Sequence, residues 1–173
     1  MSKTPASVDP VTKRLLDGVA GLIAATPYCW LATQGESAGV SARPMGRISP
    51  HPQKTDWSIS FVTNRRSRKF SEMRREKRVT LVFDGAPRDQ FAALSGIAVI
   101  CDGADERERR WKSEFDQFFP TQPDRRDAVF IDVSVDRMEL WIKGVTPEPF
   151  GRRTTILIRN ADGGWRSRPD PEV

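Results

Sequence analysis

The sequence predicts a mainly β domain, an antiparallel β-barrel with helices added around it. Short segments rich in β-branched and aromatic residues follow one another at regular spacing, with turn signals between them. Neither G-x-G-x-x-G nor G-x-x-x-x-G-K-[ST], the glycine motifs of parallel α/β nucleotide-binding sheets, occurs in the chain. The 173 residues fit one domain, which we expect to span residues 11–173 behind a disordered segment of residues 1–10.

The first part of the chain predicts one helix and three strands. Apolar residues recur every three or four positions in residues 11–25, which indicates a helix with one apolar face. Residues 28–33 and 40–48 are typical of a hairpin with a turn at residues 35–39. Residues 57–63 alternate apolar and polar side chains, as does a strand with one face in a core.

The second part predicts two further helices among the remaining strands. Residues 64–76 indicate a short charged surface helix. Residues 105–119 are expected to be helical and to turn their aromatics inward, because Trp111, Phe115 and Phe118 recur at helical spacing. Gly96 is a candidate bulge. The remaining predicted strands are residues 79–83, 91–101, 129–135, 138–142 and 154–158, followed by a turn at 160–164 and Trp165.

Composition narrows the classes of function. No apolar run reaches the roughly 20 residues of a membrane helix, and no secretory signal precedes Pro10, so we expect a soluble cytoplasmic protein. Cys29 and Cys101 lie in separate apolar stretches, which predicts two buried thiols. The one histidine, His51, stands in a proline-flanked loop, so neither a metal site nor a Ser-His-Asp hydrolase is expected.

Candidate anion ligands lie in two segments. The net charge of +5 predicts an anionic partner. Arg43 offers a planar guanidinium, and the pattern Thr63-x-x-x-Ser67-x-Lys69 adds a hydroxyl and an ammonium at the start of a helix, where backbone N–H groups are free. This spacing favours a phosphate site, although basic residues at strand ends are also common on solvated surfaces.

A series of motifs in fixed order covers roughly residues 12–143. The motifs are Tyr28-x-Trp30-Leu31-Ala32-Thr33, Arg43-Pro44-Met45, Trp57-x-Ile59-x-Phe61-x-Thr63, Ser67-x-Lys69, Val79-Thr80-Leu81-x-Phe83, Ser95-Gly96-x-Ala98, Trp111 followed by Phe118-Phe119-Pro120, and Glu139-Leu140-Trp141. In order and spacing they resemble the FMN-binding split barrels related to pyridoxamine 5′-phosphate oxidase, and within these the general stress protein class.

The resemblance implies a split β-barrel that binds FMN between the two subunits of a homodimer. The residues that it places at the cofactor are Arg43, Ser67 and Lys69 on the phosphate, Pro44 and Met45 beside the ring, and Thr63 and Asn64 at the turn that approaches the flavin. Trp141 matches an aromatic that comes close to the partner subunit's flavin, with packing in a core or interface as the alternative.

The same resemblance implies an FMN-dependent oxidoreductase with a reduced nicotinamide as electron donor and a stress-related role. No side chain stands out as a catalytic acid or base, and a flavoprotein can lack one because the cofactor itself transfers hydride and electrons. Oxidation of vitamin B6 is not expected, because that oxidase holds its substrate with C-terminal arginine and histidine residues and no histidine follows Trp141.

Two other functions stay open. A protein of the same fold could hold flavin as a sensor or store, without turnover. Nucleic-acid binding is the less favoured alternative: residues 65–78 hold eight basic residues among fourteen, with Glu72 and Glu76 as the acids. The single aromatic of this segment, Phe70, is turned toward the core by the helical pattern, so support from base stacking is missing.

Overall fold

A computed structural model describes residues 9–37, 39–48, 57–86 and 89–169. Of the segment 1–10 that is expected to be disordered, residues 1–8 lie outside the described residues, as does the loop that contains His51, whereas Asp9 caps α1 and Pro10 begins it. The helices and strands, in chain order, are α1 (Pro10–Ala25), β1 (Tyr28–Gln34), β2 (Val40–Gly46), β3 (Ser58–Asn64), α2 (Arg68–Arg75), β4 (Arg78–Gly85), β5 (Gln90–Cys101), α3 (Ala104–Arg110), the 3-10 helix η1 (Ser113–Phe115), α4 (Gln122–Asp127), β6 (Ala128–Ile142), β7 (Thr155–Arg159) and β8 (Trp165–Pro169).

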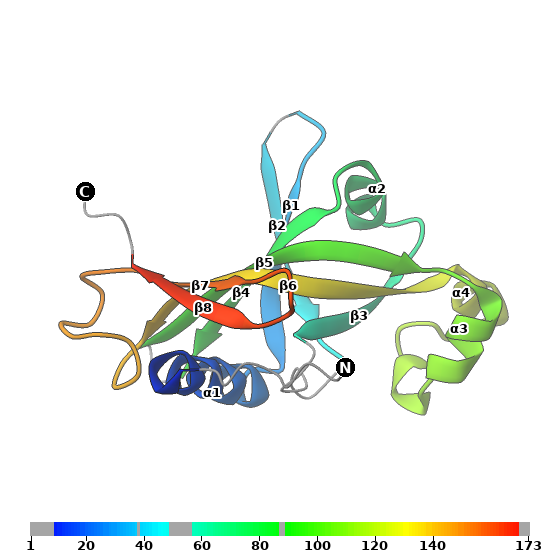
Figure 1. Cartoon of the computed structure of the whole chain (residues 1–173). Helices are drawn as coiled ribbons and strands as arrows, with labels where there is room; N and C mark the ends of the chain where they lie inside the picture. Colours follow the sequence, from blue (N-terminus) through cyan, green and yellow to red (C-terminus); the bar gives the residue numbers. More distant parts are fainter. Residues whose placement is uncertain (1–8, 38, 49–56, 87–88, 170–173) are drawn as a thin grey trace, which may run out of the picture.

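The strands form one eight-stranded antiparallel sheet that branches at β6 (Figure 1). Its order is β2-β1-β4-β5-β6-β7-β8, and β3 pairs with the N-terminal half of β6, whereas β7 pairs with the C-terminal half. The N–H of Ile48, just after β2, donates to the carbonyl oxygen of Ser60 on β3 at 2.9 Å. This bond brings the chain after β2 to β3, so the sheet closes into a barrel whose strands part at β6, as the sequence predicted.

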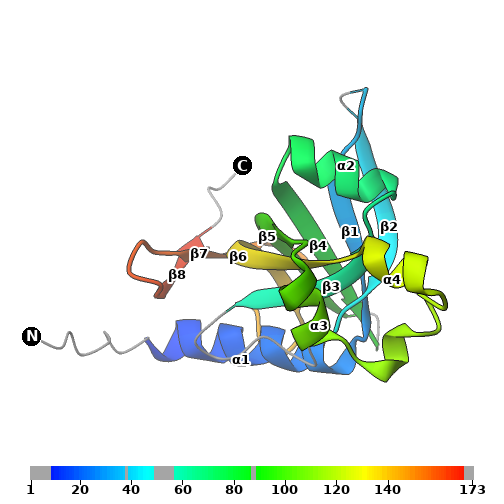
Figure 2. The ribbon, with the colours of Figure 1, turned by 90° about the vertical axis from the view of Figure 1, so that its right-hand side faces the viewer.

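The main core lies between the inner face of the sheet and α1, which runs along one side of the barrel (Figures 1 and 2). The predicted apolar face of α1 is buried, with Leu15, Val19, Leu22 and Ile23 each at most 3% exposed. A Cβ on Gly85 of β4 would come within 2.4 Å of Leu22 Cδ1. Glycine at this position therefore allows the helix to approach the sheet closely.

β6 is one long strand, and not the two strands that the sequence predicted. Its pairing with β5 shifts register between Ser95 and Gly96, which leaves Asp136 as the extra residue of a bulge. A Cβ on Gly96 would lie 2.2 Å from the Ser134 carbonyl oxygen, so the predicted bulge requires glycine. The polar pair Asp136-Arg137 bends the strand without ending it, because β5 pairs with β6 on both sides of the bulge.

The expected helix over residues 105–119 is confirmed only over its first part, and its extension beyond Arg110 is wrong. The structure has α3, then η1, with α4 following, and Phe118 is 67% exposed. α3 buries no residue, and turns after it bring Trp111 into edge-to-face contact with Phe115 and Phe119, with ring centroids 5.8 Å apart in both pairs. These rings form a second, smaller core with Phe130. Tertiary packing, and not helical periodicity, gathers these aromatics.

Two smaller expectations also change. Cys29 is buried as predicted, but Cys101 is only half-buried because it lies at the end of β5. β8 is a strand that the sequence analysis did not identify, since Trp165-Arg166-Ser167-Arg168-Pro169 has no apolar alternation; Trp165 nevertheless packs edge-on against Trp57 with centroids 5.9 Å apart. Within the described residues, no helix is long and apolar enough to span a membrane.

Candidate functional site

The turn between β3 and α2 places the predicted hydroxyl ligands. Asn64 ends β3, and its side-chain oxygen accepts a hydrogen bond from the Arg66 N–H at 2.8 Å, while its carbonyl oxygen accepts one from the Ser67 N–H at 3.0 Å. Ser67 is the N-cap of α2, yet its side chain makes no capping bond and lies 3.4 Å from the Thr63 hydroxyl. The Ser67 hydroxyl is therefore not committed to the helix.

Glu72 of α2 is the buried centre of the site, with only 1% of its side chain exposed. Its Oε2 accepts hydrogen bonds from the Thr33 hydroxyl on β1 and from Arg43 Nη2 on β2, each at 2.6 Å. Arg43 Nη1 also donates to the Thr33 hydroxyl. These bonds tie α2 to the β1–β2 hairpin and hold the Arg43 guanidinium in one orientation.

The site keeps Glu72 ionised and crowds the cations around it. Burial raises the pKa of Glu72, but hydrogen bonds from Thr33 and Arg43 outweigh it, so this pKa lies below its ordinary value. The pKa of the half-buried Lys69 is lowered by burial and then by the charge of Arg43, partly offset by Glu72. The positive charges of Lys69 and Arg43 therefore repel each other, and the charge of Glu72 partly offsets this repulsion.

Charge is unbalanced in this cluster. Arg68 Nε lies 3.3 Å from Glu72 Oε1, so both Arg43 and Arg68 pair with the single carboxylate of Glu72, and the charge of Lys69 also interacts with it. Such a positive excess at the first turn of a helix favours an anion, because the anion would offset the repulsion between the cations. The donor set of guanidinium, ammonium and hydroxyl groups fits a phosphate.

The sequence predicts that the whole Arg43 guanidinium is available to a phosphate, and the structure shows that part of it is already used. Two of its nitrogens already donate to Thr33 and Glu72, which leaves its remaining N–H groups for a ligand. From the sequence, Glu72 is expected only as one of two acids in a basic segment, and its burial at the site is not predicted. The available signal was its position between Phe70 and Met73, because these residues share the inward face of α2, where a charged residue is unusual.

Pro44 and Met45 follow Arg43 on β2 and point to opposite faces of the strand. Pro44 is exposed and pairs with Trp30 of β1, whereas Met45 is half-buried and packs against the main core. The structure thus places Arg43, Pro44 and Met45 on one strand beside α2. That the ring of a cofactor lies beside Pro44 and Met45 stays a prediction from the family resemblance.

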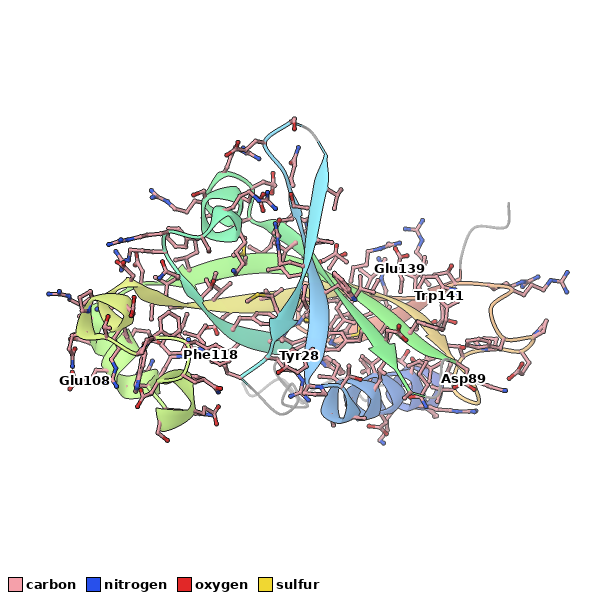
Figure 3. The ribbon with its side chains drawn as sticks, turned by 180° about the vertical axis from the view of Figure 1, so that it is seen from behind. Tyr28, Asp89, Glu108, Phe118, Glu139 and Trp141 are labelled. Carbon is pink, nitrogen blue, oxygen red and sulfur yellow. The ribbon has the colours of Figure 1, made fainter. Side chains whose placement is uncertain are left out.

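Trp141 lies on β6, and three strands of the sheet separate β6 from β2, which carries Arg43. Figure 3 shows Trp141 beside Glu139 on one side of the molecule. One row of paired residues nevertheless crosses the outward face of the sheet from β2 to β6, and its members are Pro44, Trp30, Val82, Ala93 and Glu139. Trp141 is two residues beyond Glu139 and so shares this face. The structure therefore places Pro44 and Trp141 on one face without bringing them together in one chain.

Comparison with known proteins identifies the family of this chain. A family model described as pyridoxamine 5′-phosphate oxidase like matches residues 16–167. No functionally curated protein matches the sequence.

Solved structures of low sequence identity share the fold. A pyridoxamine 5′-phosphate oxidase-related, FMN-binding protein from Nostoc punctiforme superposes with a TM-score of 0.66 at 12% identity, over 96% of this chain and 99% of that one. A Clostridium acetobutylicum protein related to general stress protein 26 gives a TM-score of 0.66 at 15% identity, over 76% and 90% of the two chains. An F420 reductase gives a TM-score of 0.51 at 16% identity, over 68% of this chain and 93% of that one.

The names of these neighbours include two different cofactors, so the shared fold does not by itself choose between them. The family assignment rests on the match of the family model, which spans most of the chain, and on the antiparallel barrel that the neighbours share. This chain belongs to the pyridoxamine 5′-phosphate oxidase-like family.

Proposed function

We propose that this protein binds FMN and works as an FMN-dependent oxidoreductase that takes electrons from a reduced nicotinamide. The observation that carries the proposal is the excess of cations around Glu72 at the start of α2. The FMN-binding neighbour from Nostoc punctiforme and the family supply the cofactor class. The stress-related role belongs to the proposal through the general stress protein neighbour.

The side chains would bind and orient the cofactor. Arg43 and Lys69 would hold the phosphate, which carries a charge of about −1.5 to −2 near neutral pH, and the Ser67 hydroxyl would donate a further hydrogen bond. Pro44 and Met45 would lie beside the ring, and the turn at Thr63 would approach it. Bound FMN supplies the hydride and electron transfer, so the chain's own task is positioning.

A homodimer completes the proposal. The outward face of β1 and β2 exposes large apolar side chains, with Tyr28 at 63%, Trp30 at 51% and Val40 at 78%. Contiguous exposure of this kind is typical of an interaction surface. A second copy that covers this face would bring its Trp141 toward the Pro44 side of the first, since both residues lie on the same face of the sheet.

Binding of FMN and of riboflavin, which lacks the phosphate, tests the cofactor and its proposed site together. We expect Lys69→Met to weaken FMN binding by about 100-fold, because loss of one charged partner costs about 2–5 kcal/mol, and to leave riboflavin binding unchanged. Lys13→Met on α1, 65% exposed, is the matched control. Burial lowers the pKa of Lys69, so Lys69→Met should not lower the free energy of unfolding, which separates lost binding from lost folding.

Three results would contradict parts of this proposal. Wild-type protein that takes up no FMN contradicts the cofactor, and uptake of F420 instead would replace it. A monomer in sedimentation equilibrium with FMN bound contradicts the dimer. Flavin absorption that does not bleach anaerobically with NADH or NADPH contradicts nicotinamide-driven turnover and favours a flavin-binding sensor or store.

A further inference from the structure

β5 has a free backbone edge near its C-terminal end. β4 pairs with β5 only as far as Ile97, whereas β6 continues to pair with β5 up to Cys101. The Ala98 N–H donates to the Lys77 carbonyl oxygen at 2.8 Å, so Ala98 faces the β4 side. Backbone groups alternate along a strand, so the N–H and carbonyl of Ile100 face the same side, where no described strand pairs with them.

A groove of about 460 Å³ along this edge is lined by residues of β5 and α2. In Figure 1, helix α2 lies beside β5. One wall is made by the four consecutive residues 97–100 of β5. Side chains of consecutive strand residues point to opposite faces, so a groove that touches all four runs along the backbone edge itself. The other lining residues are Phe70 and Arg74 of α2, Lys77 and Asp102.

Two of the residues that line the groove, Arg74 and Lys77, carry positive charges without an ion-pair partner in the described part of the chain. Both side chains are exposed. The Arg74 guanidinium lies 6.0 Å from the centre of the Phe70 ring. A second hollow of about 460 Å³ shares Phe70 and Arg74 and continues past Arg65 and Arg75. The groove thus offers the backbone groups of Ile100 together with two cations, Arg74 and Lys77, against the one carboxylate of Asp102.

We infer that this groove binds an extended acidic peptide, which adds as a short strand beside Ile100 and places its carboxylates near Arg74 and Lys77. An added strand pairs its own N–H and carbonyl groups with a free edge, which supplies affinity, while the side chains on its two faces supply specificity. Val99, which is 51% exposed, and the edge of Phe70 would contact apolar side chains of such a peptide. Charge complementarity selects acidic residues for the rest of the peptide.

Single-stranded nucleic acid fits this groove less well. Its bases bind by stacking on exposed aromatic rings, and Phe70 is only 8% exposed. A phosphate backbone would also leave the N–H group of the Ile100 edge without the regular pairing that a peptide strand provides. The burial of Phe70 confirms its predicted inward orientation. Of the basic residues in 65–78, Arg74 and Lys77 are the ones left for a peptide ligand, because the others pair within the described residues or belong to the proposed phosphate site.

Fluorescence anisotropy with a labelled acetyl-Glu-Val-Glu-Val-Asp amide tests this inference on the full chain. We expect saturable binding that weakens at least about tenfold in the double variant Arg74→Glu, Lys77→Glu, because two attractions become repulsions. The matched control is Arg166→Glu, Arg168→Glu, which reverses two exposed charges on β8. A peptide with lysines in place of its acidic residues should not bind.

A second probe isolates the strand pairing without changing the protein. The same acidic peptide with alternate backbone nitrogens methylated cannot pair along an edge, and we expect it to lose binding. No saturable binding of the unmethylated peptide, or equal binding of the methylated one, would overturn the inference. Tighter binding of oligothymidylate that the Arg74→Glu, Lys77→Glu variant abolishes would assign the groove to nucleic acid instead.

Discussion

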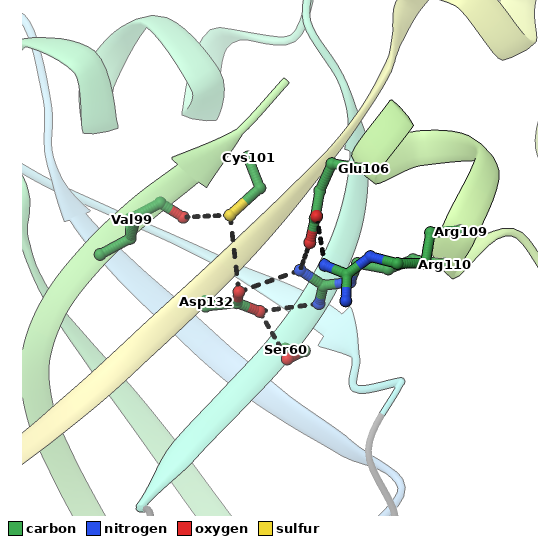
Figure 4. Close-up of polar contacts among 7 residues, drawn as sticks. All are labelled: Ser60, Val99, Cys101, Glu106, Arg109, Arg110 and Asp132. Atoms are coloured by element: carbon green, nitrogen blue, oxygen red, sulfur yellow. Dashed lines mark hydrogen bonds and ion pairs between the residues drawn. The ribbon is translucent and has the colours of Figure 1, made fainter. Parts of the chain in front are cut away.

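Two arginine–carboxylate pairs fasten helices to the barrel, and they differ in charge balance. Arg110 of α3 donates to both oxygens of Asp132 on β6, at 2.9 and 2.8 Å (Figure 4). Ser60 donates to the same carboxylate at 2.6 Å, and the Arg110 guanidinium lies 4.5 Å from the centre of the Phe130 ring. Glu106 forms ion pairs with both Arg109 and Arg110. We call these three residues and Asp132 the clasp, which contains two cations and two carboxylates.

The cluster around Glu72 has an excess of positive charge, because Arg43, Arg68 and Lys69 interact with one carboxylate. Burial and then the charge of Asp132 raise the pKa of the Cys101 thiol, whose sulfur lies 3.5 Å from Asp132, so the thiolate form of Cys101 is disfavoured. An ion pair alone therefore does not indicate a binding site. The excess of charge over its internal partners is the feature that indicates one.

Removal of the Glu72 carboxylate should have the largest effect on stability. Glu72→Ala leaves Arg43 and Lys69 without their counter-ion in a partly buried site, and we expect the free energy of unfolding to fall by about 4 kcal/mol in urea titrations. Inorganic phosphate should restore much of this loss, because an anion that binds the folded state stabilises it by mass action. Equal phosphate effects on Glu72→Ala and on Asp132→Ala would remove the proposed distinction between the two regions.

Removal of the clasp carboxylate should cost less and should not respond to phosphate. Asp132 is 29% exposed, so we expect Asp132→Ala to lower the free energy of unfolding by about 2 kcal/mol. Asp136→Ala is the control, because its pair with Arg78 is exposed at 38% and 52% and should contribute less than about 1 kcal/mol. A clasp that contributes no more than this surface pair would show that the Arg110–Asp132 pair does little to fasten α3 to β6.

The pH dependence of the clasp should be the smallest effect. Burial raises the pKa of Asp132, but hydrogen bonds from Arg110 and Ser60 outweigh it, so this pKa lies below its ordinary value. The unfolded state then takes up protons first, and the stabilisation is present above about pH 4 and is lost as pH falls through the folded pKa. The difference in unfolding free energy between wild type and Asp132→Asn should therefore shrink in acid. A difference that stays constant from pH 6 to pH 3 would contradict this assignment.

Elements that depend on local sequence could be predicted. The apolar face of α1, the hairpin of β1 and β2, and the bulge at Gly96 follow from periodicity and turn residues that neighbours in the chain carry. The helix expected over residues 105–119 ends at Arg110, and the aromatics at helical spacing beyond it pack through turns. Spacing alone cannot distinguish a helix from irregular chain that tertiary contacts hold.

The sequence by itself determined the mainly β class, the family and the residue types that suit a phosphate, because periodicity, motif order and chemistry can be read along one chain. The tertiary structure decided which of these residues lie in contact. Thr33, Arg43 and Glu72 come from three separate elements, and only folding shows that the buried carboxylate holds the arginine. The free edge at Ile100 likewise depends on where β4 and β6 end beside β5, which is a property of strand register and not of local sequence.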